Sequence, residues 1–184
     1  MVIIGITGTI GAGKGTVVEY LINKKGFKHF SARDFLVEEI EKRGLEKTRD
    51  NMVMVANDLR EKNSPSFVAD ELFKRALKLG QNCVIESLRT VGEIESLRKK
   101  GNFTLLAVDA EAKIRYERIL KRSTSTDDIS FEKFVADENR EMESTDPNKQ
   151  NLKKCIAMAD FTIINNKDIN FLNQQIEEIY GQIR

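Results

Sequence analysis

A glycine-rich segment near the start of the chain constrains the fold more than any other part of the sequence. It reads GTIGAGKGT at residues 8–16, and five of the eleven glycines fall between residues 5 and 15. The apolar run at residues 2–7 predicts a buried parallel strand before it. Apolar residues at 17, 18, 21 and 22 predict a helix that begins at about Lys14. A strand, a glycine-rich turn and a helix in this order are typical of a phosphate-binding loop.

The chemistry of this segment favours binding of an anion. Glycines lack a Cβ atom, so the backbone can bend around a phosphate and aim its N–H groups inward. The positive end of the following helix adds attraction, and Lys14 would place its charge near the β- and γ-phosphates of ATP. The simpler interpretation is an ordinary glycine-rich turn. The predicted nucleotide-binding residues are Gly8, Gly11, Ala12, Gly13, Lys14, Gly15 and Thr16.

The segment departs from the commonest phosphate-loop pattern at one position. In that pattern a serine or threonine follows the lysine and its hydroxyl contacts Mg²⁺, whereas here Gly15 follows Lys14 and the hydroxyl comes at Thr16. This GxxGxGKGT form resembles the nucleoside monophosphate kinases, of which adenylate kinase is a member. The resemblance implies that Thr16 serves the α-phosphate, with a possible contact to Mg²⁺. The metal would then keep more of its waters.

Composition excludes several classes of protein. A chain of 184 residues that is 40% hydrophobic can form one domain with a good core. The net charge of +1 argues against nonspecific nucleic-acid binding as the main role. The short apolar start predicts neither a signal peptide nor a membrane span. Cys83 and Cys155 lack metal-ligand spacing and His29 is the single histidine, so we expect a cytoplasmic protein without a histidine-based metal cluster.

Alternating strand and helix patterns predict the fold class. Strands are expected near residues 2–7, 27–30, 83–87, 103–109 and 161–164, with helical patterns between them. Such alternation is typical of an α/β fold with a five-stranded parallel sheet and helices on both faces. We therefore expect a single domain over residues 1–184 with a three-layer P-loop architecture. An acceptor-binding insertion is expected at about 32–80 and a lid at about 118–140.

The second strand delivers the chain to a helix at Ser31, which is where α/β folds place ligand groups. Ser31, Arg33 and Asp34 are therefore candidate substrate-binding residues, although ordinary helix capping explains Ser31 and Asp34 equally well. Further helices are predicted from Thr48 and from residues 64–65. The first carries Arg49 and Arg60 near its two ends.

The third strand ends in an acid, Glu86, and Arg89 follows shortly after it. A carboxylate at the tip of a buried strand needs a cation or water to offset its desolvation. We expect Glu86 to bind Mg²⁺ through water. The alternative is a structural role as a helix cap or in an ion pair with Arg89.

The helix after the fourth strand carries three arginines on one face, Arg115, Arg118 and Arg122. The polar residues 123–126 could form a flap, and a helix with Arg140 is predicted from about residue 130. The resemblance to nucleoside monophosphate kinases implies that Arg118, Arg122 and Arg140 act on the transferring phosphoryl group. The alternative is a solvated helix surface.

Several segments extend the resemblance to nucleoside monophosphate kinases over nearly the whole chain. Residues 31–34 resemble the Ser-Thr-Gly-Asp segment that opens the acceptor-binding helix. Residues 86–89 resemble the Asp-Gly-x-Pro-Arg segment, although Glu86 replaces the aspartate and the proline is absent. Residues 118–122 resemble the lid arginines, with Arg140 as the later partner. Residues 5–17 are also similar to dephospho-CoA kinase, but Ser31 and Arg33 replace the two acids of its Asp-Ala-Asp segment.

Residues 85–165 resemble archaeal adenylate-kinase-related proteins and the kinase-like segment fused to some deoxycytidylate deaminases. We therefore expect a Mg²⁺-dependent transfer of the γ-phosphoryl group of ATP to a nucleoside or deoxynucleoside monophosphate. Arg49, Arg60 and Arg89 are expected to converge on the acceptor phosphate, because arginine forks bind phosphate in bidentate fashion. A dephospho-CoA kinase-like enzyme and a non-catalytic nucleotide-binding module are the alternatives.

Overall fold

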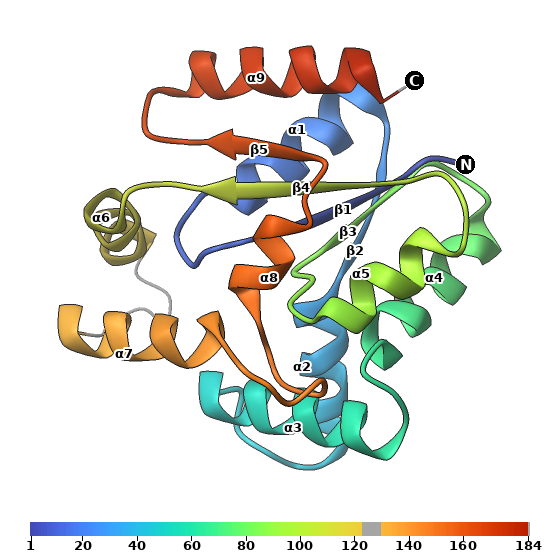
Figure 1. The fold of residues 1–184 in the computed structure, drawn as a ribbon, viewed down its shortest axis with the longest axis vertical. Coiled ribbons are helices and arrows are strands. Elements are labelled where there is room, and N and C mark those ends of the chain that lie inside the picture. Colours follow the sequence, from blue (N-terminus) through green and yellow to red (C-terminus); the bar gives the residue numbers. More distant parts are fainter. Residues whose placement is uncertain (123–129, 184) are drawn as a thin grey trace.

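The computed structural model describes residues 1–122 and 130–183, in which a parallel sheet is covered by helices on both faces (Figure 1). Strands and helices alternate because parallel neighbours need a crossover that returns the chain to the same end of the sheet. The elements are β1 (Ile3–Gly8), α1 (Lys14–Lys25), β2 (Lys28–Ser31), α2 (Ala32–Lys42), α3 (Arg49–Lys62), α4 (Phe67–Leu79), β3 (Cys83–Glu86), α5 (Val91–Arg98), β4 (Phe103–Asp109), α6 (Ala112–Arg122), α7 (Phe131–Met142), α8 (Leu152–Ala157), β5 (Phe161–Ile164) and α9 (Ile169–Gln182).

The strand order β2-β3-β1-β4-β5 places β1 at the centre of the sheet. Ile3 of β1 lies opposite Cys83 of β3 on one side and Phe103 of β4 on the other. After β1 the chain continues toward one edge of the sheet, and after β3 it crosses to the other. The carboxyl end of β1 is therefore a topological switch point, where open α/β sheets bind their ligands.

The two faces of the sheet bury alternate residues of the same strands. Ile3 and Ile85 pack with the core of α2, α3, α4, α5 and α8, whereas Ile4 and Val84 pack with α1 and α9. Figure 1 shows α1 and α9 together on one side of the sheet. Burial on both faces explains why the strands are continuous apolar runs rather than alternating ones. The α/β fold class predicted from the sequence is confirmed.

Polar residues that directly precede apolar helical patterns cap several of the helices. Ser31, Thr48 and Ser130 each accept a hydrogen bond from the backbone N–H three residues later. One predicted boundary is wrong, because α4 begins at Phe67 rather than at residues 64–65. The Phe67 N–H donates to the Ser64 carbonyl oxygen, so the chain makes a turn there before the helix starts.

The longest helices, α3 and α9, have 14 residues each. A helix needs about 20 apolar residues to cross a bilayer. Within residues 1–122 and 130–183, none is both long and apolar enough to do so.

Candidate functional site

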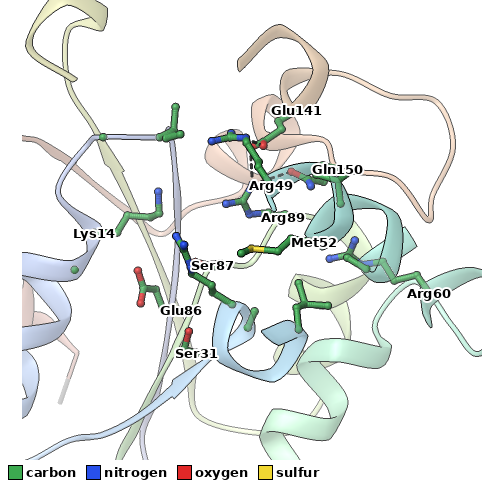
Figure 2. Close-up of a pocket in the computed structure, with 18 of the residues that line it drawn as sticks. Lys14, Ser31, Arg49, Met52, Arg60, Glu86, Ser87, Arg89, Glu141 and Gln150 are labelled. Carbon is green, nitrogen blue, oxygen red and sulfur yellow. Dashed lines mark hydrogen bonds and ion pairs between the residues drawn. The ribbon is translucent and has the colours of Figure 1, made fainter. Parts of the chain in front are cut away.

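A cavity of about 270 Å³ lies at the switch point, between the phosphate loop (residues 8–16) and helices α2 and α3 (Figure 2). It brings together residues that the sequence singled out in separate segments. Those that line it are Gly11, Lys14, Gly15, Ser31, Arg33, Arg49, Arg60, Glu86, Arg89 and Arg122.

Three glycines of the phosphate loop are required by the fold itself. Gly8, Gly11 and Gly13 have φ angles of +133°, +77° and +97°, which other residues rarely adopt. A Cβ on Gly8 would lie 2.0 Å from the Val108 carbonyl oxygen, and one on Gly11 would lie 2.6 Å from that of Arg115. At Gly15 a Cβ would meet no atom of the described chain within 4 Å. The first turn of α1 is therefore open on the side of Gly15.

The loop is braced by residues that the sequence did not place in the site. The Asn165 side-chain amide donates to the Ala12 carbonyl oxygen at 2.8 Å, and Arg115 Nη1 donates to the Ile10 carbonyl oxygen at 3.3 Å. Asn165 directly follows β5, so its position at a strand's carboxyl end was the available signal. These bonds hold the loop in shape, and the first N–H groups of α1 lack helical acceptors, as at any helix start.

Lys14 folds over the loop that precedes it. Its Nζ donates to the carbonyl oxygens of Gly8 at 3.0 Å and Thr9 at 2.7 Å. Burial lowers the pKa of Lys14 to about 8, and the positive charge of Arg89 acts in the same direction. An anion beside Lys14 would stabilise its charged form and raise that pKa.

Glu86 lines the cavity at the tip of β3, as predicted, but its partner is not Arg89. His29 Nε2 lies 3.1 Å from a Glu86 carboxylate oxygen. Burial raises the pKa of Glu86, but the bond from His29 and the charges of Lys14 and Arg89 outweigh it, so the pKa lies below its ordinary value. The group is thus a carboxylate at neutral pH.

The described residues contain no cluster of three or more His, Cys, Asp or Glu side chains able to hold a metal ion. A Mg²⁺ ion at this site would depend mainly on phosphate oxygens and water, which suits its reluctance to dehydrate. Glu86 could supply one carboxylate to its shell, and Thr16 lies in the first turn of α1. The donor set fits a metal that arrives with a nucleotide.

Arg49 and Arg89 meet on one buried carboxylate, that of Glu141 on α7. Arg49 Nη2 and Arg89 Nη1 lie 2.5 Å from its two oxygens, and the Glu141 side chain is only 3% exposed. Gln150 accepts a further bond from Arg89 at 2.9 Å. Figure 2 shows these four side chains gathered on one side of the cavity. Glu141 and Gln150 were missed because they lie 52 and 61 positions from Arg89.

The third predicted acceptor arginine occupies another part of the cavity. Arg60 is 2% exposed and pairs with Glu93 at 2.9 Å rather than with Glu141. It lies eleven residues after Arg49 on α3, which is about 16 Å along a helix. Two of the three arginines therefore meet at one point and the third does not join them.

The arginine face of α6 turns toward the loop and α7. Arg115 is 6% exposed and pairs with Glu138, and Arg118 Nη2 lies 3.5 Å from the Asn165 amide oxygen. Arg122 lines the cavity. The expected flap at residues 123–126 lies outside the described residues, as does the rest of 123–129 within the predicted lid.

Ion pairs and a helix cap bear on the predicted roles of Arg140, Asp34 and Ser31. Arg140 lies outside the cavity lining and pairs with Asp50 at 2.8 Å and Asp137 at 3.4 Å. Ser31 both lines the cavity and caps α2 by accepting a bond from the Asp34 N–H at 3.1 Å. The capping interpretation therefore holds for Ser31, and Asp34 supplies the capped backbone group.

Ser87 combines an unusual backbone with a place in the cavity. Its φ angle is +70°, the one positive value among the described non-glycine residues. A serine in the left-handed region is strained, and such strain gathers at functional sites. Ser87 directly follows Glu86 and precedes Arg89 by two residues, so the unusual backbone lies between two charged residues of the cavity. The sequence alone carried no signal for this conformation.

Comparison with known proteins identifies the family of the chain. The family model AAA_18, an AAA domain, matches residues 4–146. A UPF0200 protein of Pyrococcus abyssi is 32% identical over 187 residues, covering 98% of this chain and 96% of the relative. A UPF0200 protein of Methanocaldococcus jannaschii is 31% identical over 186 residues, covering 100% of this chain and 91% of the relative.

Solved structures share the fold at low identity. TT1252 from Thermus thermophilus has a TM-score of 0.63 and 18% identity, over 100% of this chain and 98% of that one. A Janibacter sugar kinase has a TM-score of 0.57 and 18% identity, over 98% of this chain and 93% of that one. Shikimate kinase from Bacteroides thetaiotaomicron has a TM-score of 0.54 and 10% identity, over 99% of this chain and 98% of that one. The fold is thus that of a P-loop protein with kinases among its neighbours, and by its family model and its relatives the chain belongs to the AAA_18 domain family and to the UPF0200 proteins.

Proposed function

We propose that this protein is an ATP-dependent phosphotransferase that moves the γ-phosphoryl group of ATP to a nucleoside or deoxynucleoside monophosphate, with Mg²⁺ on the phosphates. One observation carries the proposal: a single cavity holds Lys14 of the phosphate loop and the arginine pair Arg49 and Arg89. A donor phosphate and an acceptor phosphate bound at these two positions would face each other.

Each part that phosphoryl transfer needs is assigned in this proposal to a residue on the donor side of the cavity or on α6. An oxygen of the acceptor phosphate attacks the γ-phosphorus, the bond to the β–γ bridging oxygen breaks, and ADP leaves. Lys14 and the N–H groups at the start of α1 would neutralise the charge that develops on the phosphates. Arg118 and Arg122 from α6 would add positive charge, and Glu86 would order the water shell of Mg²⁺.

The acceptor side fits a phosphate monoester. Two guanidinium groups that share one carboxylate still have unused N–H donors, and arginine forks match phosphate oxygens in bidentate fashion. The family model supports a nucleotide-binding P-loop protein. The sugar kinase and shikimate kinase among the structural neighbours support a kinase that acts on a small molecule.

The test is transfer itself, measured with ATP, Mg²⁺ and a panel of acceptors. We expect ADP and a nucleoside diphosphate to form in equal amounts with at least one ribo- or deoxyribonucleoside monophosphate. Lys14→Ala should abolish transfer while the circular dichroism spectrum stays unchanged. Faster phosphorylation of dephospho-CoA than of every nucleotide would favour the dephospho-CoA kinase-like alternative. ATP binding without transfer to any acceptor would favour a regulatory module.

A further inference from the structure

Arg60 has a buried nitrogen atom for which the described structure offers no hydrogen-bond partner. Its side chain is 2% exposed, lines the cavity, and leaves Nη1 without an acceptor. The other two nitrogens, Nε and Nη2, both donate to Glu93 Oε1, at 3.3 and 2.9 Å. Buried donors without acceptors are rare in native proteins, and each needs a physical reason.

Glu93 holds the Arg60 guanidinium in a fixed orientation. The second carboxylate oxygen of Glu93 accepts from the backbone N–H groups of Arg89 at 2.8 Å and Thr90 at 3.1 Å. The Glu93 N–H donates to the Thr90 hydroxyl, which completes the capping box of α5. Because Glu93 cannot move freely, Arg60 cannot turn Nη1 toward another partner. The free donor is therefore pre-organised.

The chemical character of the cavity changes along one face of α3. Arg49, Met52, Ala56 and Arg60 follow the i, i+3, i+7, i+11 spacing of a single helix face, and all four line the cavity. Leu36 of α2 adds to the apolar middle. In the view of Figure 2, Met52 lies between the guanidinium groups of Arg89 and Arg60. We call Leu36, Arg49, Met52, Ala56, Arg60 and Arg89 the acceptor wall.

The order of charged and apolar surfaces along the cavity indicates which kind of ligand would fit there. The end with Arg49 and Arg89 suits an anion, the apolar middle suits a flat ring, and the end with Arg60 offers one charged donor. A group placed against Arg60 Nη1 must accept a hydrogen bond. An amino group there would leave two donors facing each other without an acceptor.

We propose, on the basis of the proposed function, that Arg60 Nη1 donates to the exocyclic oxygen at the distal edge of the acceptor base. The acceptor class is then the 4-keto pyrimidine and 6-keto purine monophosphates, which carry uracil, thymine, guanine or hypoxanthine. Cytosine and adenine have an amino group at the corresponding position. Arg60 thus determines base specificity rather than binding the phosphate.

Equilibrium binding of matched monophosphates, measured by calorimetry without ATP, tests this assignment. UMP should bind about tenfold to a hundredfold more tightly than CMP, and GMP than AMP, because a charged donor gains or loses its acceptor. Purine riboside monophosphate, which has only hydrogen at position 6, should bind about as weakly as AMP. This comparison needs no mutant and so does not depend on how well a variant folds.

Arg60→Lys supplies the variant arm. Lysine keeps a positive charge beside Glu93 but has no group that corresponds to the fixed Nη1 donor of Arg60. If the Nη1 bond is the source of the keto preference, that preference should fall to under about threefold. Arg75→Lys is the matched control, since Arg75 pairs with Glu38 outside the cavity, and it should keep the preference. Thermal unfolding of both variants reports whether they are folded.

Four results would overturn the proposal: equal binding within each pair, a preference for the amino base, a keto preference that survives in folded Arg60→Lys, or no binding of all the monophosphates tested. A keto preference in binding without phosphoryl transfer would instead contradict the proposed function and leave the role of Arg60 intact.

Discussion

The phosphate loop and the acceptor wall face each other across one cavity, but they are built in different ways. The loop takes its shape from nine consecutive residues, and three of its four glycines, Gly8, Gly11 and Gly13, adopt backbone angles that few other residues allow. The acceptor wall is assembled from α2, α3 and the segment after β3. Its arginines are fixed by two buried carboxylates, Glu141 and Glu93.

This difference predicts how each region responds to substitution. A side chain added at Gly8, Gly11 or Gly13 of the loop acts on the backbone and on the packing around the central strand, so it should affect the whole fold. A change in the acceptor wall removes one charged contact between segments that are otherwise held by the core, so its effect should be smaller and more local. The experiments below test this contrast in order of decreasing effect.

Gly8→Ala should give the largest effect. The new Cβ would be 2.0 Å from the Val108 carbonyl oxygen at a φ angle of +133°. Left-handed strain and overpacking together should lower the free energy of unfolding by about 2–5 kcal/mol. The control is Gly15→Ala, which has room for the methyl group and should be neutral or stabilising by about 0.5–1 kcal/mol. Urea unfolding measures both, and equal losses would contradict the role given to the strained backbone at Gly8.

Glu141→Gln should have an intermediate effect. The amide can no longer accept two charge-assisted bonds, so Arg49 and Arg89 lose their shared partner, which should lower the free energy of unfolding by about 1–3 kcal/mol. Glu143→Gln is the control, because Glu143 is 64% exposed and its pair with Lys153 lies at the surface; we expect a much smaller loss there. Thermal unfolding distinguishes them. If the Glu141→Gln variant is as stable as its control, the Glu141 carboxylate does not stabilise the acceptor wall.

The pH dependence of ATP binding should give the smallest effect. Free Lys14 has a pKa of about 8 because it is buried, and bound phosphates favour its charged form. Above pH 8 binding must therefore take up a proton, so affinity falls as pH rises, by about fivefold between pH 8 and 9. Arginine stays charged over this range. Lys14→Arg should consequently bind ATP with a flat profile, and a slope that persists in this variant would show that another group titrates.

The sequence predicted what depends on neighbours along the chain. The loop, the five strands, the cap at Ser31 and the helix start at Thr48 each have a local cause, which is backbone geometry, hydrophobic spacing or a capping side chain. These features, together with the alternation of strands and helices, were sufficient to predict the α/β fold.

The partners of the charged residues could not be predicted in this way. Arg49 and Glu141 are 92 positions apart, and Asn165 and Ala12 are 153 apart. Which acid meets which arginine depends on the order of the strands and on how α7 returns over α3. The sequence identified the arginines as candidates for anion binding, but only the assembled fold separates the position of Arg60 from that of Arg49 and Arg89.

The central claim is that the phosphate loop and the acceptor wall form one site for two phosphate-bearing ligands. The most direct test is the affinity of a bisubstrate analogue, adenosine joined to uridine through five phosphates, with the guanosine analogue as a second probe. Binding both ends at once should make it at least about a hundredfold tighter than ATP, and Lys14→Ala and Arg89→Ala should each remove that gain. An analogue that binds no more tightly than ATP would contradict the account.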